Sequence, residues 1–347
     1  MTLRLAQVIA GGANGGAENF FVRLNLALHG ETDIEQQAFL RHHPQRQQAL
    51  LEGGLRCQNF RFGGPLHWLD RLHYRRALKQ FTPDVVMTWM NRASQLTPAG
   101  NYQLVARLGH YYNLKYYRHC NHWIGISRGI CDHLVAGGMP AQRVHYIPNF
   151  ASEAPVPAVE RSAFSTPPKV PLLLAAGRLH ENKGFDVLIR ALVEIPEAVL
   201  WLAGDGPEEA ALKALAVDLG VSERIRFIGW WPDIASLLQS ADLFVCPSRH
   251  EGLGSVVLEA WLNRCPIVAT ASQGPGELIE DGITGLLTPV DQVQPLAGAI
   301  RQLIDQPPLR QALADTAWQH YQSHFSQQVI TRQYQELLNG LAGTVNP

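Results

Sequence analysis

The sequence predicts an α/β protein built from two Rossmann-like, doubly wound domains in tandem that face each other across a central cleft. The length of 347 residues is more than one ordinary core contains. Short apolar runs alternate with segments of helical spacing, which is typical of βαβ units and parallel sheets. A proline-rich stretch at 148–171 interrupts this alternation, which then starts again. We therefore expect one domain on each side of that stretch.

The apolar runs are the expected strands, and the segments between them supply the helices. The expected strands are 3–10, 84–89, 122–127, 144–149, 171–177, 198–204, 225–229, 243–248 and 266–271. The expected helices are 19–29, 66–81, 128–136, 186–195 and 327–341. The strands of the second half are apolar throughout, which indicates a parallel sheet with both faces covered.

These elements divide the chain into four segments. We expect an N-terminal domain at 1–155, a linker stiffened by prolines at 156–170, a second domain at 171–326 and a helical segment at 327–347. Ligands of parallel sheets bind beyond the carboxyl ends of the strands. Two such domains therefore suit a transfer between two substrates.

The net charge of −1 hides an asymmetry between the halves. Residues 1–150 contain 16 Lys and Arg against 8 Asp and Glu, whereas the remainder contains 13 against 22. This balance favours an anionic partner for the first half, although charges also drift between domains without function. The sequence shows no apolar run of membrane-spanning length, no signal-peptide core and no short cysteine pair for a metal. We expect a cytoplasmic protein, at most peripheral at the inner face of the membrane, with no nucleic-acid partner.

The segment EGLGSVVLE, residues 251–259, has the strongest chemical signature. Gly252 and Gly254 permit a tight turn, and a helix is predicted from Ser255. The start of a helix favours phosphate, and Glu259, one turn further, could accept hydrogen bonds from a ribose diol. A turn, a helix and a solvated glutamate would have the same spacing.

A pair of cations follows the strand at 171–177. In GRLHENKG, Arg178 and Lys183 lie at the carboxyl end of this buried strand. A guanidinium and a mobile ammonium can clamp a diphosphate. The alternative is two solvated loop cations, which is less common at the mouth of a parallel strand.

The series GRLHENKG, AGDGP, FIGWWPD, PSRHEGLGSVVLEAW and DGITGLL resembles the donor domain of glycosyltransferase family 4, which has the GT-B fold. The N-terminal GGANGGAE is similar to the acceptor-domain loop of that family. The resemblance implies a nucleotide-sugar donor in the second domain and a saccharide or lipid-linked acceptor in the first. It also implies that the final helix crosses back to the first domain.

The resemblance assigns roles to the motif residues. Arg178 and Lys183 would bind and stabilise the leaving diphosphate, with Gly177 at the same strand end, and Glu259 would bind the ribose. Glu251 would hold the hydroxyls of the transferred sugar. The turn that would bind the distal phosphate consists of Gly252, Leu253, Gly254 and Ser255.

Three further assignments are less specific. The turn that ends at Asp233 would border the nucleobase, and Gly15 and Gly16 would let the first domain's backbone approach the donor phosphates. His110 would contact the donor sugar, although ten of the 14 histidines lie in this half and a surface histidine is an equal alternative.

Members of the family retain the anomeric configuration without an enzymatic nucleophile. The resemblance therefore implies that the protein positions both substrates and stabilises the charge that develops on the diphosphate. We expect no cofactor. No Asp-x-Asp pair occurs in the sequence, so we expect no metal either. The sugar and its nucleotide, UDP or GDP, stay open.

The predicted helix 66–81 combines Trp68 and Leu72 with basic residues, among them Arg71 and Arg75. It could lie on an anionic membrane, or it could be an ordinary helix packed on the sheet. Lys115 and Arg118, one helical turn apart, could bind an anionic acceptor. We therefore hypothesise an acceptor from lipopolysaccharide core or a related envelope glycan.

Three other functions fit parts of the sequence. A nucleotide-sugar epimerase of GT-B-like fold would convert the donor without an acceptor. A dinucleotide-dependent oxidoreductase is suggested by GGANGG, but that loop lacks a clean G-x-G-x-x-G. A non-catalytic nucleotide-sugar binding protein would not need the complete set of charged residues.

Overall fold

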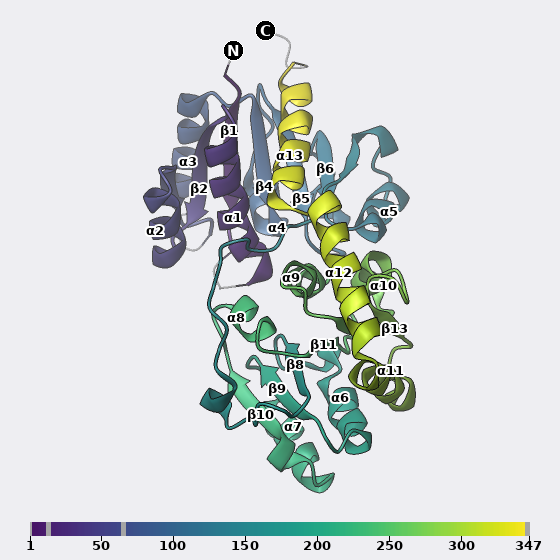
Figure 1. The fold of residues 1–347 in the computed structure, drawn as a ribbon. Coiled ribbons are helices and arrows are strands. Elements are labelled where there is room, and N and C mark those ends of the chain that lie inside the picture. Colours follow the sequence, from purple (N-terminus) through teal and green to yellow (C-terminus); the bar gives the residue numbers. More distant parts are fainter. Residues whose placement is uncertain (1, 12–14, 64–66, 344–347) are drawn as a thin grey trace. The chain divides into compact units, whose positions relative to one another are not determined.

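The structure is a computed structural model that describes residues 2–11, 15–63 and 67–343. The chain forms two compact units. The first consists of Met1–Asn149 together with Gln327–Pro347, and the second is Phe150–Ser326. Each unit contains one parallel sheet with helices between its strands (Figure 1).

The first unit is a doubly wound sheet with the strand order β3-β2-β1-β4-β5-β6-β7. All its strand pairs are parallel, so each connection has to cross over. Its strands are β1 Arg4–Ile9, β2 Glu35–Arg41, β3 Arg56–Phe60, β4 Val85–Trp89, β5 Gln103–Leu108, β6 His122–Gly125 and β7 Val144–Tyr146. Its helices are α1 Gly16–Glu31, α2 Pro44–Glu52, α3 His67–Phe81, α4 Met90–Leu96, α5 Arg128–Ala136 and α13 Gln327–Ala342.

The last helix, α13, packs against α1 and β4 although it follows them by more than 200 residues (Figure 1). Its buried residues include Ile330, Tyr334 and Leu338, which repeat every four residues along one face of the helix. Tyr334 accepts a hydrogen bond from Nε of the buried Arg107 at 2.9 Å. The first unit therefore needs the end of the chain to complete its core.

The second unit has the strand order β10-β9-β8-β11-β12-β13, again with parallel pairing throughout. Its strands are β8 Leu172–Ala176, β9 Val199–Ala203, β10 Ile225–Gly229, β11 Leu243–Cys246, β12 Ile267–Thr270 and β13 Leu286–Thr288. Its helices are α6 Phe185–Ala191, α7 Glu209–Asp218, α8 Ile234–Leu238, α9 Ser255–Leu262, α10 Gln273–Leu278, α11 Val293–Asp305 and α12 Pro307–His324.

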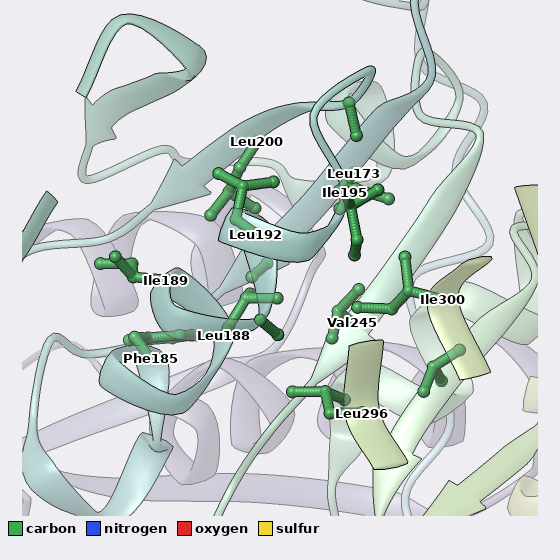
Figure 2. Packing of buried hydrophobic residues seen from close by; sticks show 14 of the residues in the cluster. Leu173, Phe185, Leu188, Ile189, Leu192, Ile195, Leu200, Val245, Leu296 and Ile300 are labelled. Carbon is green, nitrogen blue, oxygen red and sulfur yellow. The ribbon is translucent and has the colours of Figure 1, made fainter. Parts of the chain in front are cut away.

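One hydrophobic cluster fixes β8, β11 and α6 to each other in the second unit. Leu173 of β8 and Val245 of β11 are fully buried in it together with Leu188 of α6 (Figure 2). Burying a side chain of this size contributes about 1.5–3 kcal/mol relative to leaving it exposed. This packing therefore holds the carboxyl ends of β8 and β11 and the start of α6 in fixed positions.

The proline-rich stretch packs on the second unit. A short 3₁₀ helix, Arg161–Phe164, forms within it. The Arg161 guanidinium donates to the Ser240 carbonyl and pairs with Asp242 at 3.0 Å. Trp201 of β9 donates to Thr166 at 2.8 Å. Residues 156–170, expected as a separate linker, therefore belong to the second unit, which begins at Phe150.

The strands expected from apolar runs are confirmed, each within a few residues, and α5 has the expected bounds. The helix expected at 186–195 ends earlier, because α6 stops at Ala191 and a 3₁₀ turn, Leu192–Glu194, follows. The sequence interpretation did not include β2, β3, β5 and β13. In the described ranges no helix is both long enough and apolar enough to span a membrane.

Candidate functional site

The charged motifs of the second unit meet at the switch point of its sheet. Strands β8 and β11 pair directly, while their connections lead to opposite sides of the strand order. Loop 177–184 follows β8, and loop 247–254 follows β11. The carboxyl ends of two strands at such a switch point form the usual ligand crevice of an open parallel sheet.

Lys183 and Glu251 form an ion pair between these two loops. The Lys183 ammonium donates to the Glu251 carboxylate, and both side chains are about one-fifth exposed, at 23% and 19%. Burial is the largest single effect and disfavours the charged amine, but the charges of Glu251 and Cys246 and the hydrogen bond to Glu251 together outweigh it and raise the pKa of Lys183. The ammonium is thus held charged, at a position 68 residues from its partner in the sequence.

Gly177 and Arg178 begin the first loop. Gly177 has φ +150°, and a Cβ there would be 3.3 Å from Cε of Lys183, so the glycine lies directly beside the lysine side chain. Arg178 is exposed, and among the described residues it has no hydrogen-bond or ion-pair partner. Its guanidinium is therefore available to a ligand.

Arg249, which the sequence interpretation did not single out, ties the two loops together. Its guanidinium binds Asp186 of α6 through two parallel hydrogen bonds of 2.9 and 2.8 Å. It also donates to the Glu181 carbonyl at 2.7 Å and to Asp291 at 2.5 Å. Hydrogen bonding to Asp186 raises the pKa of Arg249, so the clamp stays charged.

Gly184 brings the loops into backbone contact. Its φ is +63°, and a Cβ at this position would overlap the carbonyl oxygen of Pro247. Only glycine can adopt the left-handed φ without strain and also lacks the Cβ that would meet Pro247. The position of Lys183, the preceding residue, is thus determined by backbone contact as well as by its side chain.

The turn 252–254 leads into α9, which begins at Ser255. Gly254 has φ +75° at the N-terminal end of the helix, and the Gly274 amide donates to the Glu251 carbonyl at 2.9 Å. Leu253 is buried, which anchors the turn, whereas Glu259 is half-buried one turn into the helix. Glu251, the partner of Lys183, therefore lies on the loop that leads into the first turn of α9.

Asp233 has a structural partner. Its carboxylate accepts the Ala235 amide at 3.1 Å and caps the short helix α8. Trp230, three residues earlier, has 63% of its surface exposed. The turn after β10 therefore exposes the ring of Trp230 to solvent. One carboxylate oxygen of Asp233 is occupied by the backbone amide of Ala235.

The remaining predicted site residues belong to the first unit. His110 follows β5 and is exposed, with Tyr111 and Tyr112 against its ring. Gly15 and Gly16 begin α1, and a Cβ at Gly15 would be 2.8 Å from Oε2 of Glu18, so this carboxylate lies over the helix start. Residues 12–14 of the same glycine-rich turn lie outside the described residues.

The basic segments of the first unit differ in part from expectation. Lys115 and Arg118 are exposed, but a 3₁₀ turn, Leu114–Tyr116, replaces the α-helical turn between them, because Asn113 caps it and Gly137 packs on Leu114. Helix α3 buries Leu78 and Phe81 in the core, as an ordinary packed helix does. Its outer side exposes Trp68, Leu72 and the arginines at 71, 75 and 76.

Within the described residues no group of three or more His, Cys, Asp or Glu side chains could hold a metal ion. The charges of the second unit's switch point come instead from Arg178, Lys183 and Glu251. This arrangement can bind a diphosphate with its cations and a polyhydroxylated group with its carboxylate.

Comparison with known proteins adds independent findings. The family model described as glycosyl transferases group 1 matches residues 158–320. The lipopolysaccharide core biosynthesis glycosyltransferase LpsE of Rhizobium meliloti (strain 1021) is 38% identical over 336 residues, which are 94% of this chain and 96% of that protein. LpsD of the same organism, with the same description, is 34% identical over 331 residues, with the same coverage.

A solved structure of Anabaena HepE in complex with UDP and glucose has a similar fold. The TM-score is 0.83 at 22% identity, over 97% of this chain and 100% of that chain. At this identity the likeness concerns the fold alone. Together with the two parallel sheets, it confirms the predicted α/β architecture of GT-B type.

Proposed function

This chain belongs to the group 1 glycosyltransferases of GT-B fold, and we propose that it transfers a hexose from a UDP- or GDP-sugar to a saccharide of lipopolysaccharide core. The observation that carries the proposal is the Lys183–Glu251 ion pair at the switch point of the second sheet. The names of the full-length relatives support the acceptor class. The proposal includes retention of anomeric configuration, as in glycosyltransferase family 4.

The donor diphosphate would lie between Arg178 and Lys183. The lysine has three N–H donors, so it can keep its bond to Glu251 while it binds a phosphate oxygen. Arg178 has no competing partner among the described side chains and can approach from solvent. The first amides of α9, from Ser255 on, would bind the distal phosphate, because a helix start favours negative charge.

The transferred sugar would lie against the Glu251 carboxylate, and the ribose against Glu259 further along α9. Trp230 offers the nucleobase an exposed aromatic face next to the turn that Asp233 caps. His110, Gly15 and Gly16 would complete the donor site from the first unit.

The chemistry we propose needs no protein nucleophile. As the bond from the sugar to the diphosphate breaks, the acceptor hydroxyl bonds to the same face of the sugar and its proton passes to an oxygen of the leaving phosphate. The negative charge that grows on the phosphate oxygens is stabilised by Arg178 and Lys183. Because Arg249 and Gly184 fix the loop that carries Lys183, this charge is in place before the reaction. We propose that these side-chain cations serve in place of a metal ion.

The acceptor side belongs to the first unit in this proposal. Residues 1–150 contain twice as many basic as acidic residues, which suits an acidic, lipid-linked core saccharide at the inner face of the membrane. The exposed Trp68 and Leu72 with the arginines of α3 would provide a peripheral membrane contact. Flotation with anionic vesicles should recover the protein at low salt, and absence of binding would remove this contact.

Product analysis tests the proposed function. The purified chain is incubated with UDP- and GDP-sugars, with and without core oligosaccharide, and the released nucleotide and the anomeric signals of the product are measured. We expect nucleotide release that depends on acceptor, a retained anomeric configuration and activity that survives EDTA. An inverted product would contradict retention, and conversion of the donor sugar without acceptor would contradict transfer.

The epimerase alternative is not favoured, because the full-length relatives are described as glycosyltransferases. The same comparison gives no support to an oxidoreductase. A screen of unfolding temperature against UDP- and GDP-sugars separates the donors. At about 100 times the dissociation constant, a bound donor adds about 2.7 kcal/mol to the free energy of unfolding.

A further inference from the structure

A cavity of about 850 Å³ lies in the first unit, at the carboxyl ends of β2 and β3. Arg41, the last residue of β2, and Arg61, directly after β3, line it. Arg92 of α4 lines it as well. Open parallel sheets bind ligands at the carboxyl ends of their strands. This cavity therefore lies where a ligand-binding site is expected.

The three arginines leave their positive charge uncompensated by ion pairs. Arg61 and Arg92 are exposed and Arg41 is half-buried, and none of them forms an ion pair with another described residue. Like charges that share one space repel each other unless an anion lies between them. Guanidinium groups also have the fork geometry that matches phosphate and carboxylate.

Asp70 is the single carboxylate among the residues that line the cavity, and it is engaged with backbone. Its two oxygens accept the amides of Arg61 and Phe62, each at 2.9 Å. Phe62 has φ +50°, a conformation that costs a non-glycine residue free energy and that these hydrogen bonds help to hold. Asp70 therefore fixes the loop that carries Arg61.

Aromatic rings form an apolar part of the cavity lining. Phe60 and Phe62 are 9% and 3% exposed, and their ring centroids are 5.8 Å apart in an edge-to-face arrangement. With so little exposed surface, the two rings form the inner wall of the cavity and leave recognition to the arginines. Guanidinium groups beside this wall suit the acidic group of an anionic sugar.

We propose that the Arg41–Arg61–Arg92 pocket binds an anionic saccharide, one with a phosphate or carboxylate substituent, as part of the acceptor. The inference rests on the proposed function, and it names the chemical class of the acceptor. The pocket selects for the charge by paired guanidinium hydrogen bonds. A neutral sugar cannot form these charged hydrogen bonds and binds more weakly.

Matched probes test this pocket on the full-length protein. Binding of glucose 6-phosphate, glucuronate and glucose is measured by titration calorimetry at low salt, for the native chain and for Arg61→Gln and Arg92→Gln. Arg56→Gln is the control, because Arg56 lies at the other end of β3 and does not line the cavity. Unfolding temperatures show that every variant is folded.

We expect at least one charged probe to bind at least about tenfold more tightly than glucose, since hydrogen bonds between charged groups are the strong ones. Arg61→Gln and Arg92→Gln should each remove most of that difference, and Arg56→Gln should keep it. The tighter of the two charged probes identifies phosphate or carboxylate. Equal binding of charged and neutral probes, or native affinity in both pocket variants, would overturn the proposal.

A parallel measurement of UDP and GDP binding separates this inference from the proposed function. The pocket variants should bind the nucleotide as the native chain does, because no residue assigned to the donor lines this pocket. A chain that binds nucleotide but no charged probe retains the proposed function and loses the pocket. A chain that binds the charged probe but no nucleotide loses the proposed function and retains an anion site.

Discussion

Arg249 and Asp186 form a planar, two-bond ion pair, with Nη1 to Oδ1 at 2.9 Å and Nη2 to Oδ2 at 2.8 Å. The pair joins the loop after β11 to the first turn of α6, across 63 residues of sequence. Burial raises the pKa of Asp186, but hydrogen bonds and the charge of Arg249 outweigh it and lower the pKa below its ordinary value of 3.8. The clamp therefore loosens only in strong acid.

Arg249→Lys should weaken donor binding more than it destabilises the fold. Lysine keeps the charge but cannot form the two parallel bonds, so loop 177–184 loses its fixed position. We expect the Kd of the cognate nucleotide, measured by calorimetry, to rise about tenfold. Arg301→Lys, which changes an exposed arginine 3.9 Å from Glu194, is the control and should bind normally. Equal affinities for both variants would contradict a positioning role.

Lys183→Ala should lose at least about a hundredfold in kcat, as the removal of one donor to a developing negative charge does. Lys213→Ala removes a charge of the same kind from the exposed pair with Glu209 and should leave the rate unchanged. Steady-state kinetics and unfolding temperature are measured for both variants. Near-normal turnover in a folded Lys183→Ala protein would remove the diphosphate assignment.

Gly184→Ala and Gly220→Ala form a matched pair for backbone stability. Both glycines have a left-handed conformation, with φ +63° and +67°, so each substitution costs about 1–2 kcal/mol from strain. Only at Gly184 does the new Cβ overlap another group, the Pro247 carbonyl, which adds about 1–3 kcal/mol. Urea unfolding should rank Gly184→Ala as the less stable variant, and equal stabilities would show that the loops separate freely.

Tyr334→Phe should cost about 1.5–3 kcal/mol, because it removes the acceptor of a hydrogen bond from a buried guanidinium. Arg107 also lies over the rings of Phe20 and Trp89, at 4.7 and 4.2 Å. In an Arg107→Met background the same tyrosine substitution should cost much less. Identical costs in the two backgrounds, measured by denaturant unfolding, would show that the pair is not coupled.

His122 should make the stability of the first unit depend on pH. Burial, with smaller effects of His145 and Arg143, lowers its pKa from 6.5 to about 4. Between these two values the unfolded chain binds the proton and the folded protein does not, so the free energy of unfolding decreases as the pH falls from about 6.5 to about 4. His122→Gln should flatten this decrease, whereas His119→Gln, an exposed control, should not.

The sequence predicted the central strands because burial on both faces leaves a continuous apolar run. β8, with the sequence LLLAA, is such a strand. β3 is different, since it lies at the edge of its sheet and most of its side chains are exposed, so RCQNF carries no apolar signal. β2 has no exposed residue and was missed for a different reason, since the buried Gln36 and the neighbouring Gln37 interrupt its apolar run. Exposure at the sheet edge hid β3, and polar side chains inside the strand hid β2.

The candidate site was predicted to the level of residue type and sequence order. Glycine-rich turns and charges at strand ends mark Lys183 and Glu251, but their ion pair depends on the direct pairing of β8 with β11. Arg249 lies within a recognised motif, yet its partners Asp186 and Asp291 are 63 and 42 residues away. The buried Arg107 has no local signal, because its surroundings come from distant parts of the sequence, among them Phe20, Trp89 and Tyr334 of α13.

The place of α13 in the first unit has a consequence for the order of biosynthetic folding. The second unit is contiguous, so it can fold as soon as residue 326 has left the ribosome. The first unit, although translated earlier, still lacks the helix that covers α1 and β4. Domains commonly fold in the order in which they are synthesised. Here the N-terminal unit reaches its final form after the second unit, once α13 has left the ribosome.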